Sequence, residues 1–357
     1  MIDILENILP YISGLYTLPW IPIGFAVTII LAKIMGREKI DKIMKKIGLI
    51  LLYFFVPILI FRIFINTTFG KNEIEFAIVV SIVIFFMYLL AFLYAKYGAK
   101  KQKLAGSEKN LYIKTVVTNQ GRSSAFIGSM MLAIQTWSVY AAIFMALVGI
   151  ALFAIMPYIL SFMHKKETKN VVKEEQIKTL PWYLKLYPWY LLVFVIAGIV
   201  AHAYTGQKSA DLIGYNADVI LRLYTSITIP AALYYVGAGI HPGDLKKTEL
   251  RKLIGLDKTT EKADHWIWVR KTFILTVVIT PLIITIFFTV LYLLKMITGP
   301  WLAVIAINAI LPVTSTNMFL LPYGIDKKTT AHVVTWTTLV CVPIVVFLII
   351  FLSAYLA

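Results

Sequence analysis

Long, nearly uninterrupted apolar stretches recur along this chain and constrain its fold more than any other feature. A helix needs about 20 mostly apolar residues to cross the hydrocarbon core of a bilayer. Inside that core every backbone N–H and C=O must find its partner within the protein, so segments of this length and polarity are predicted to be helices. The ten predicted spans are 18–35, 46–65, 74–94, 111–134, 137–163, 189–204, 217–240, 268–294, 301–323 and 330–356.

The composition favours a membrane protein and argues against a soluble one. Of the 357 residues, 60% are hydrophobic and only 15% are charged, and the mean hydropathy is +0.82. A water-soluble domain of this length has a larger share of charged residues. Basic loops beside a membrane explain the formal net charge of +16 better than nucleic-acid binding does. We therefore expect an all-α polytopic membrane protein in a lipid bilayer, with no nucleic-acid partner.

The basic residues are distributed unevenly between the loops that join the predicted spans. Most of the 34 Lys and Arg residues follow odd-numbered spans, whereas the loops on the other side hold only Lys71, Lys208 and Lys295. Because loops rich in Lys and Arg stay in the cytoplasm, we expect a multi-pass protein of the cell (cytoplasmic) membrane with both termini outside. The N-terminal segment 1–16 has no basic residue, so we interpret it as a short interfacial segment and not as a cleavable signal.

The ten predicted spans divide into two halves with related features. Residues 1–163 are predicted to form a first five-helix repeat, 164–184 a cytoplasmic linker, and 185–357 a second repeat that is inserted upside down. Pro57 and Pro230 lie at the centres of spans two and seven, and polar runs interrupt spans four and nine. In secondary carriers, interrupted helices at matching positions of two inverted repeats indicate a binding site at the membrane midplane.

The polar runs in spans four and nine contain the candidate site. Pro312 lacks a backbone donor and is predicted to break span nine, whereas Gly121 and Gly128 are expected to allow a break in span four. A broken helix exposes N–H groups at the start of its second half, where the positive end of the helix dipole attracts anions. The candidate substrate-binding residues are Asn119, Gln120, Arg122, Ser123, Thr314, Thr316 and Asn317.

Arg122 is the strongest functional candidate among these residues. A guanidinium stays protonated, and placing it near the bilayer centre costs several kcal/mol or more. Few acidic residues lie within the predicted spans, so a substrate carboxylate is an attractive partner. For each of the other polar residues a structural role is favoured, because Ser and Thr often bond to their own backbone. Arg62 and Arg222 lie near the outer ends of their spans and are expected to extend toward the interface.

Three segments resemble the auxin efflux carrier family, membrane transporters that include the plant auxin exporters and bacterial malonate and malate carriers. These segments are LLYFFVPILIF in span two, IPAALYYVGAGI in span seven and NAILPVTSTNMFLLPYGID in span nine. The resemblance covers nearly the whole chain in span order. It implies two inverted five-helix repeats with broken, crossing helices four and nine, and a substrate held between a scaffold and a mobile bundle.

The resemblance also assigns positions within the two crossing helices. Carried over by residue, Pro312 and Asn317 fall on the crossing of span nine, and Gly128 matches the family's glycine in span four. Two positions depart from the family pattern, since Met130 stands where proline is usual and Ser123 where asparagine is usual.

Taken together, these features predict a secondary transporter, a permease or efflux carrier that moves a small organic anion such as a carboxylate by alternating access. The sequence contains no P-loop, no H-E-x-x-H and no G-x-S-x-G, so we expect neither ATP-driven transport nor an enzyme. No cofactor and no metal site are expected, and the lone Cys341 is predicted to be a buried thiol.

Coupling to H⁺ or Na⁺ and facilitated diffusion both stay open, and a homodimer is one candidate for the oligomeric state. The alternatives are a sensor or receptor on a transporter fold, a channel, and a carrier of an amino acid or another weakly charged solute.

Overall fold

The computed structural model describes eleven segments of the chain, and within them the protein is built from helices. The only extended pairing among these residues is one isolated antiparallel bridge. The described residues are 19–66, 70–124, 127–156, 158–160, 162–163, 182–240, 247–256, 265–314, 317, 320 and 323–356. The predicted N-terminal segment 1–16 and most of the predicted linker lie outside them.

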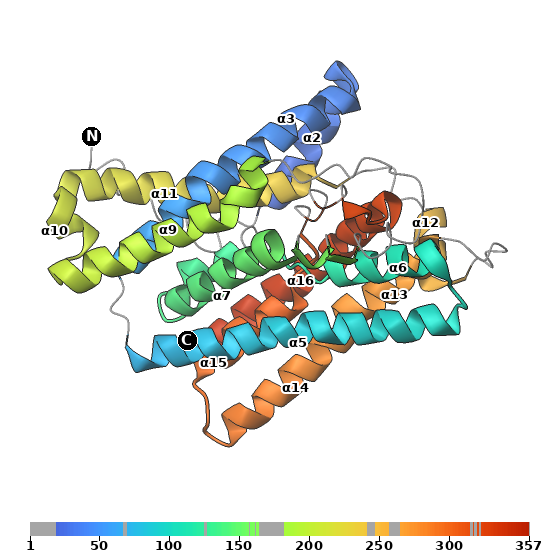
Figure 1. Cartoon of the computed structure of the whole chain (residues 1–357). Coiled ribbons are helices and arrows are strands. Elements are labelled where there is room, and N and C mark those ends of the chain that lie inside the picture. Colours follow the sequence, from blue (N-terminus) through green and yellow to red (C-terminus); the bar gives the residue numbers. More distant parts are fainter. Residues whose placement is uncertain are drawn as a thin grey trace.

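The helices follow one another as labelled in Figure 1. In chain order they are α2 (Trp20–Met35), α3 (Arg37–Ile50), α4 (Val56–Ile65), α5 (Lys71–Lys101), α6 (Gly106–Thr118), α7 (Ser138–Ile150), α9 (Trp182–Thr205), α10 (Ser209–Ile213), α11 (Tyr215–Ala238), α12 (Lys247–Ile254), α13 (His265–Ile274), α14 (Thr280–Leu293), α15 (Gly299–Ile310) and α16 (Lys327–Leu356).

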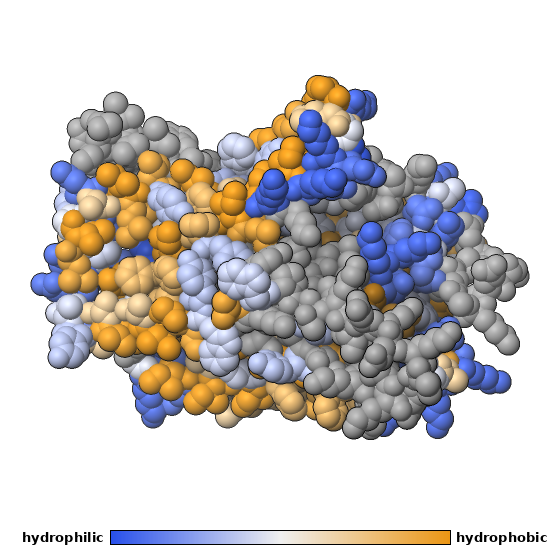
Figure 2. All heavy atoms as spheres, turned by 45° about the horizontal axis from the view of Figure 1, so that its top comes forward, coloured by the Kyte–Doolittle hydropathy of each residue, from blue (hydrophilic) through white to orange (hydrophobic). Residues whose placement is uncertain are grey.

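Within the described part of the chain, four continuous helical stretches are long and apolar enough to cross a membrane. They are Arg37–Ile65, Lys71–Lys101, His265–Leu293 and Lys327–Leu356, and shorter apolar helices accompany them in α2, α7, α9 and α15. The large hydrophobic side chains on the outside of α5 fit this reading, since Ile82 is 62% exposed and Phe85 is 68% exposed. Figure 2 shows hydrophobic residues over much of the left part of one face, with hydrophilic residues at its left edge, on its right and in a band at the upper centre. The predicted all-α membrane class is thus confirmed, and the count of ten spans stays a prediction.

Several helices extend beyond the spans predicted from hydropathy. The second span was expected to begin at Lys46, but helix already begins at Arg37, so residues assigned to a loop lie on a helix. The reason is that charged residues can support a helix outside the membrane, as in the ion pair between Arg37 Nε and Asp41 Oδ1 at 2.9 Å. Similarly, α9 begins at Trp182, so the predicted linker boundary at residue 184 falls inside this helix.

Three helices contain a π-helical turn, and the sequence has a proline two residues after each. The turns are Leu51–Phe55, Ala151–Ile155 and Leu275–Ile279, and the prolines are Pro57, Pro157 and Pro281. A proline cannot donate to the carbonyl four residues earlier, so the preceding turn loses its normal bond and can widen. Pro57 and Pro281 therefore modify helices without ending them.

Two pairs of helices, α2 with α11 and α4 with α9, are in close contact through glycines. A Cβ added to Gly24 of α2 would collide with the carbonyl oxygen of Tyr234, and one added to Gly237 of α11 would collide with that of Ile21. On α9, a Cβ at Gly198 would lie 2.9 Å from Phe64 Cβ. Small residues allow helix backbones to approach this closely in membranes. Figure 1 shows α3, α9 and α11 grouped on one side of the molecule, and α5, α13, α14 and α15 on the other.

Candidate functional site

Helix α6 stops at Thr118 in the middle of the predicted fourth span. Asn119 leaves helical geometry with φ −74° and ψ 14°, and the next helical segment among the described residues is the short 3₁₀ segment Gly128–Ala133. Gly121 N–H still donates to the Thr118 carbonyl at 3.1 Å, which closes the last turn. The fourth predicted span is therefore not one continuous helix.

Helix α15 stops at Ile310, so the predicted ninth span is interrupted as well. Leu311 is extended with ψ 144°, and Pro312 follows directly. The residue before a proline is biased toward extended geometry, which explains why the helix ends here. In the figure, the two interruptions lie between α6 and α7, in the middle of the molecule (Figure 1).

The two interrupted segments run antiparallel and bond to each other through their backbones. Ser123 N–H donates to the Pro312 carbonyl at 2.9 Å, and Thr314 N–H donates to the Gly121 carbonyl at 2.9 Å. Arg122 and Val313 form the isolated bridge between these bonds. Non-helical backbone at membrane depth is tolerated only where protein groups or water satisfy it, and here each segment satisfies the other. We refer to residues 119–124 and 311–314 together as the crossing.

The guanidinium of Arg122 is buried at the crossing, since the residue is 3% exposed. Its Nη1 donates to the Leu311 carbonyl at 3.2 Å and its Nη2 to Gln120 Oε1 at 3.3 Å, while Nε has no partner. Leu311 follows the last residue of α15, so the positive charge lies at the negative end of that helix dipole. Among the described residues, no carboxylate forms an ion pair with Arg122.

Several amide groups around Arg122 are buried without hydrogen-bond partners. Both side-chain atoms of Asn317 lack a partner, as do Gln120 Nε2 and Asn119 Oδ1. Each such group costs about 1–3 kcal/mol if nothing satisfies it. The crossing therefore combines an unneutralised cation with both donors and acceptors, which is a suitable environment for a small polar anion.

A side chain at Gly121 or at Gly128 would force neighbouring side chains to move. A Cβ at Gly121 would lie 2.5 Å from Asn317 Oδ1, and one at Gly128 would lie 2.9 Å from Leu311 Cδ1. The sequence suggested these glycines for their flexibility. Their position shows a different constraint, because they let the two interrupted segments approach each other.

Of the predicted residues, the structure brings Asn119, Gln120, Arg122, Ser123, Thr314 and Asn317 together with Gly121 and Pro312, whereas Thr316 lies outside the described residues.

Sequence reasoning missed three residues that support the crossing from neighbouring helices. Ser124 Oγ donates to Asn308 Oδ1 at 2.8 Å, and Thr337 Oγ1 accepts from Val313 N–H at 3.1 Å. Asn119 Nδ2 donates to Thr330 Oγ1 at 3.3 Å. An amide within the apolar α15 was the one available signal for Asn308.

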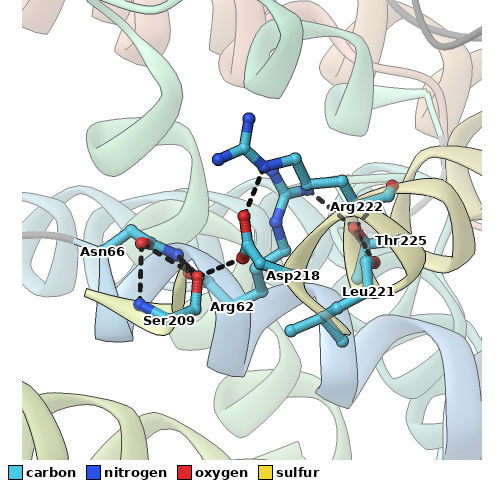
Figure 3. Close-up of polar contacts among 7 residues, drawn as sticks. All are labelled: Arg62, Asn66, Ser209, Asp218, Leu221, Arg222 and Thr225. Atoms are coloured by element: carbon cyan, nitrogen blue, oxygen red, sulfur yellow. Dashed lines mark hydrogen bonds and ion pairs between the residues drawn. The ribbon is translucent and has the colours of Figure 1, made fainter. Parts of the chain in front are cut away.

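A second polar cluster links α4, α10 and α11 away from the crossing (Figure 3). Asp218, fully buried, accepts from Arg222 Nε at 2.6 Å and from Ser209 Oγ at 2.5 Å. Arg62 Nη1 donates to Thr225 Oγ1 at 2.7 Å. Arg62 is thus partly buried and bonds to α11, while its expected extension toward the interface stays a prediction. Asp218 already has an Arg partner, so this cluster is a structural connection between helices.

Comparison with known proteins gives this chain no relatives by sequence: no family model matches it, and no curated protein matches it. The class of the protein follows from the fold and from its buried polar groups. It is an α-helical membrane protein in which two interrupted helices meet around a buried arginine.

Proposed function

We propose that this protein is a secondary transporter that moves a small organic anion, in particular a mono- or dicarboxylate, across the cytoplasmic membrane by alternating access. The observation that carries the proposal is the buried Arg122 guanidinium, which has two neutral acceptors and no carboxylate partner among the described residues. Arg binds carboxylates through two parallel hydrogen bonds, so a substrate carboxylate would neutralise it.

The unpartnered amides give this proposal its second support. Gln120 Nε2 and Asn317 Nδ2 can donate to a carboxylate, and Asn317 Oδ1 can accept from a hydroxyl or amide of the same substrate. A site with few polar groups, held by packed helices, is typical of small-molecule binding sites. The substrate would then replace hydrogen bonds that are missing in its absence.

The proposal includes two inverted five-helix repeats, as the resemblance to the auxin efflux carrier family implies. Helix packing supports it. Span one (α2) packs along span seven (α11), and span six (α9) packs along span two (α4). This pattern is expected if span six repeats span one and span seven repeats span two. In the same way α5 contacts α6 and α14 contacts α15. The distribution of basic residues supports cytoplasmic loops after the odd-numbered spans, with both termini outside.

Uptake by proteoliposomes tests the proposal. Labelled malate, malonate and an indole-containing acid are offered to vesicles that contain the purified protein, with and without H⁺ or Na⁺ gradients. Saturable uptake of at least one acid, above that of protein-free vesicles, is expected. If the folded protein moves none of these acids under any gradient, the proposal that it transports carboxylates is rejected. A sensor on a transporter fold or a carrier of weakly charged solutes then becomes the better account.

A further inference from the structure

Helix α12 is a short amphipathic helix between the predicted spans 217–240 and 268–294. One side of it is fixed to the protein by Leu253, which is 8% exposed and packs in a hydrophobic cluster with Trp266 and Val269 of α13. Lys252 reinforces this contact, since its Nζ lies 5.9 Å from the centre of the Trp266 ring. The orientation of α12 about its axis is therefore determined.

The side of α12 that adjoins Leu253 exposes apolar and basic side chains next to each other. Leu250 is 40% exposed and Ile254 is 61% exposed, and these two residues lie one turn apart. Lys247 and Arg251 are also exposed and also one turn apart. At 100° per residue the four side chains fall within one continuous arc of the helix surface, the basic pair beside the apolar pair. Leu256, just after the helix, is 66% exposed and extends the apolar part.

Helix α12 lies near one end of a helical stretch that is long and apolar enough to cross a membrane. Figure 1 shows α12 at the end of the molecule opposite α10, close to α13. Helix α13 begins the membrane-length stretch His265–Leu293, so α12 comes shortly before a candidate membrane span in the chain. Helices that lie in a membrane interface have apolar residues on one face and Lys or Arg on the polar face. Anionic headgroups attract each such basic residue by about 1 kcal/mol, a factor of about five in binding.

We propose that α12 lies in the membrane interface and selects anionic phospholipids. Lys247 and Arg251 bind the headgroup phosphates, while Leu250 and Ile254 insert among the acyl chains beneath them. Charge complementarity favours this partner, because the exposed apolar residues are bordered by basic residues. The proposal does not depend on what the protein transports.

Fluorescence quenching by labelled lipids tests this proposal on the full chain. Ile254→Cys, in a Cys341→Ala background, is labelled with a fluorophore and placed in nanodiscs with one fixed mixture of phosphatidylcholine and phosphatidylglycerol. Two samples are compared: in one the acyl chains of phosphatidylglycerol are brominated, and in the other those of phosphatidylcholine. We expect brominated phosphatidylglycerol to quench more strongly than brominated phosphatidylcholine. Replacing Lys247 or Arg251 by Gln should lower the preference by up to about fivefold each, whereas Lys71→Gln at the other end of the molecule should not change it.

Three outcomes would overturn the proposal. Absence of quenching by either lipid would mean that water or protein covers α12. Equal quenching by both lipids when Lys247 and Arg251 are both present would mean that the apolar residues of α12 insert without selecting charge. Quenching that is lost when each disc holds two copies of the chain would identify a second copy as the partner.

Discussion

Arg122 holds parts of the crossing together and keeps one hydrogen-bond donor without a partner. Its bonds to the Leu311 carbonyl and to Gln120 hold the crossing together, and the carbonyl end of α15 partly offsets its charge. These partners are neutral, however, and Nε stays without one. A structural role alone would be better served by a fully satisfied guanidinium, so the remaining capacity favours a ligand.

Gly121→Ala tests how closely the crossing is packed. The new Cβ would lie 2.5 Å from Asn317 Oδ1 and 2.9 Å from Leu152 Cδ1, so the Asn317 side chain must move. Overpacking of this kind costs about 1–3 kcal/mol. We expect a lower thermal midpoint in detergent and impaired transport. The control is Gly70→Ala, whose only near neighbour is the flexible Glu73 carboxylate; equal effects from the two substitutions would contradict the packing argument.

Asp218→Asn tests the second polar cluster. The substitution removes a charged acceptor from Arg222 and Ser209, and hydrogen bonds to charged groups contribute about 1.5–3 kcal/mol each. We expect clear destabilisation in thermal unfolding, followed by tryptophan fluorescence. Glu75→Gln is the matched control, because its ion pair with Lys71 is exposed and contributes about 0–1 kcal/mol. If the unfolding midpoint of Asp218→Asn matches that of the control, the cluster does not stabilise the helices.

At the scale of elements, the sequence predicted helix type well and helix boundaries less well. The apolar stretches identified the membrane helices because hydrocarbon permits little else, and the proline of span nine coincides with the end of α15. The extension of α3 outside the membrane and the existence of α12 were missed, since charged residues do not reveal a helix by hydropathy. The pairing of the two interrupted segments could not be read at all, because it joins residues far apart in the chain.

The close contact between α2 and α11 predicts that two glycine substitutions will differ in how much they lower the unfolding midpoint. A Cβ at Gly237 would collide with the backbone carbonyl of Ile21, whereas one at Gly48 would meet only the ring of Tyr235, 2.7 Å away. A ring can rotate, but a helix backbone cannot move without separating the two helices. Gly237→Ala should therefore lower the unfolding midpoint more than Gly48→Ala does. The reverse order would show that α2 and α11 are not held as closely as described.

At the scale of the whole molecule, the helices form two groups that contact each other through α7, which packs against α4 and α9. Helices α5, α6, α7 and α13 to α16 surround the interrupted segments, while α2, α4, α9 and α11 pack among themselves. Carriers that work by alternating access move one such group against the other. The proposed orientation gives this arrangement a direction, with loops after the odd-numbered spans in the cytoplasm.

The orientation can be checked by labelling single cysteines in sealed cells. Cys341 is buried, so it should not react with a membrane-impermeant maleimide. Lys71→Cys, at the outer end of α5, should be labelled from outside, and Lys100→Cys, at the other end of the same helix, only after the membrane is opened. Labelling of Lys100→Cys in intact cells would reverse the proposed topology.

The central claim is that Arg122 binds the carboxylate of a transported substrate, and initial uptake rates in proteoliposomes test it most directly. Wild type, Arg122→Gln and Arg37→Gln are compared for the acid that wild type transports best, at equal amounts of folded protein. We expect Arg122→Gln to lose about 10²-fold or more, because a charge-assisted pair buried from water contributes several kcal/mol. Arg37→Gln, which removes a partly exposed guanidinium on α3, should transport at nearly the wild-type rate. Normal uptake by a folded Arg122→Gln protein would contradict the account.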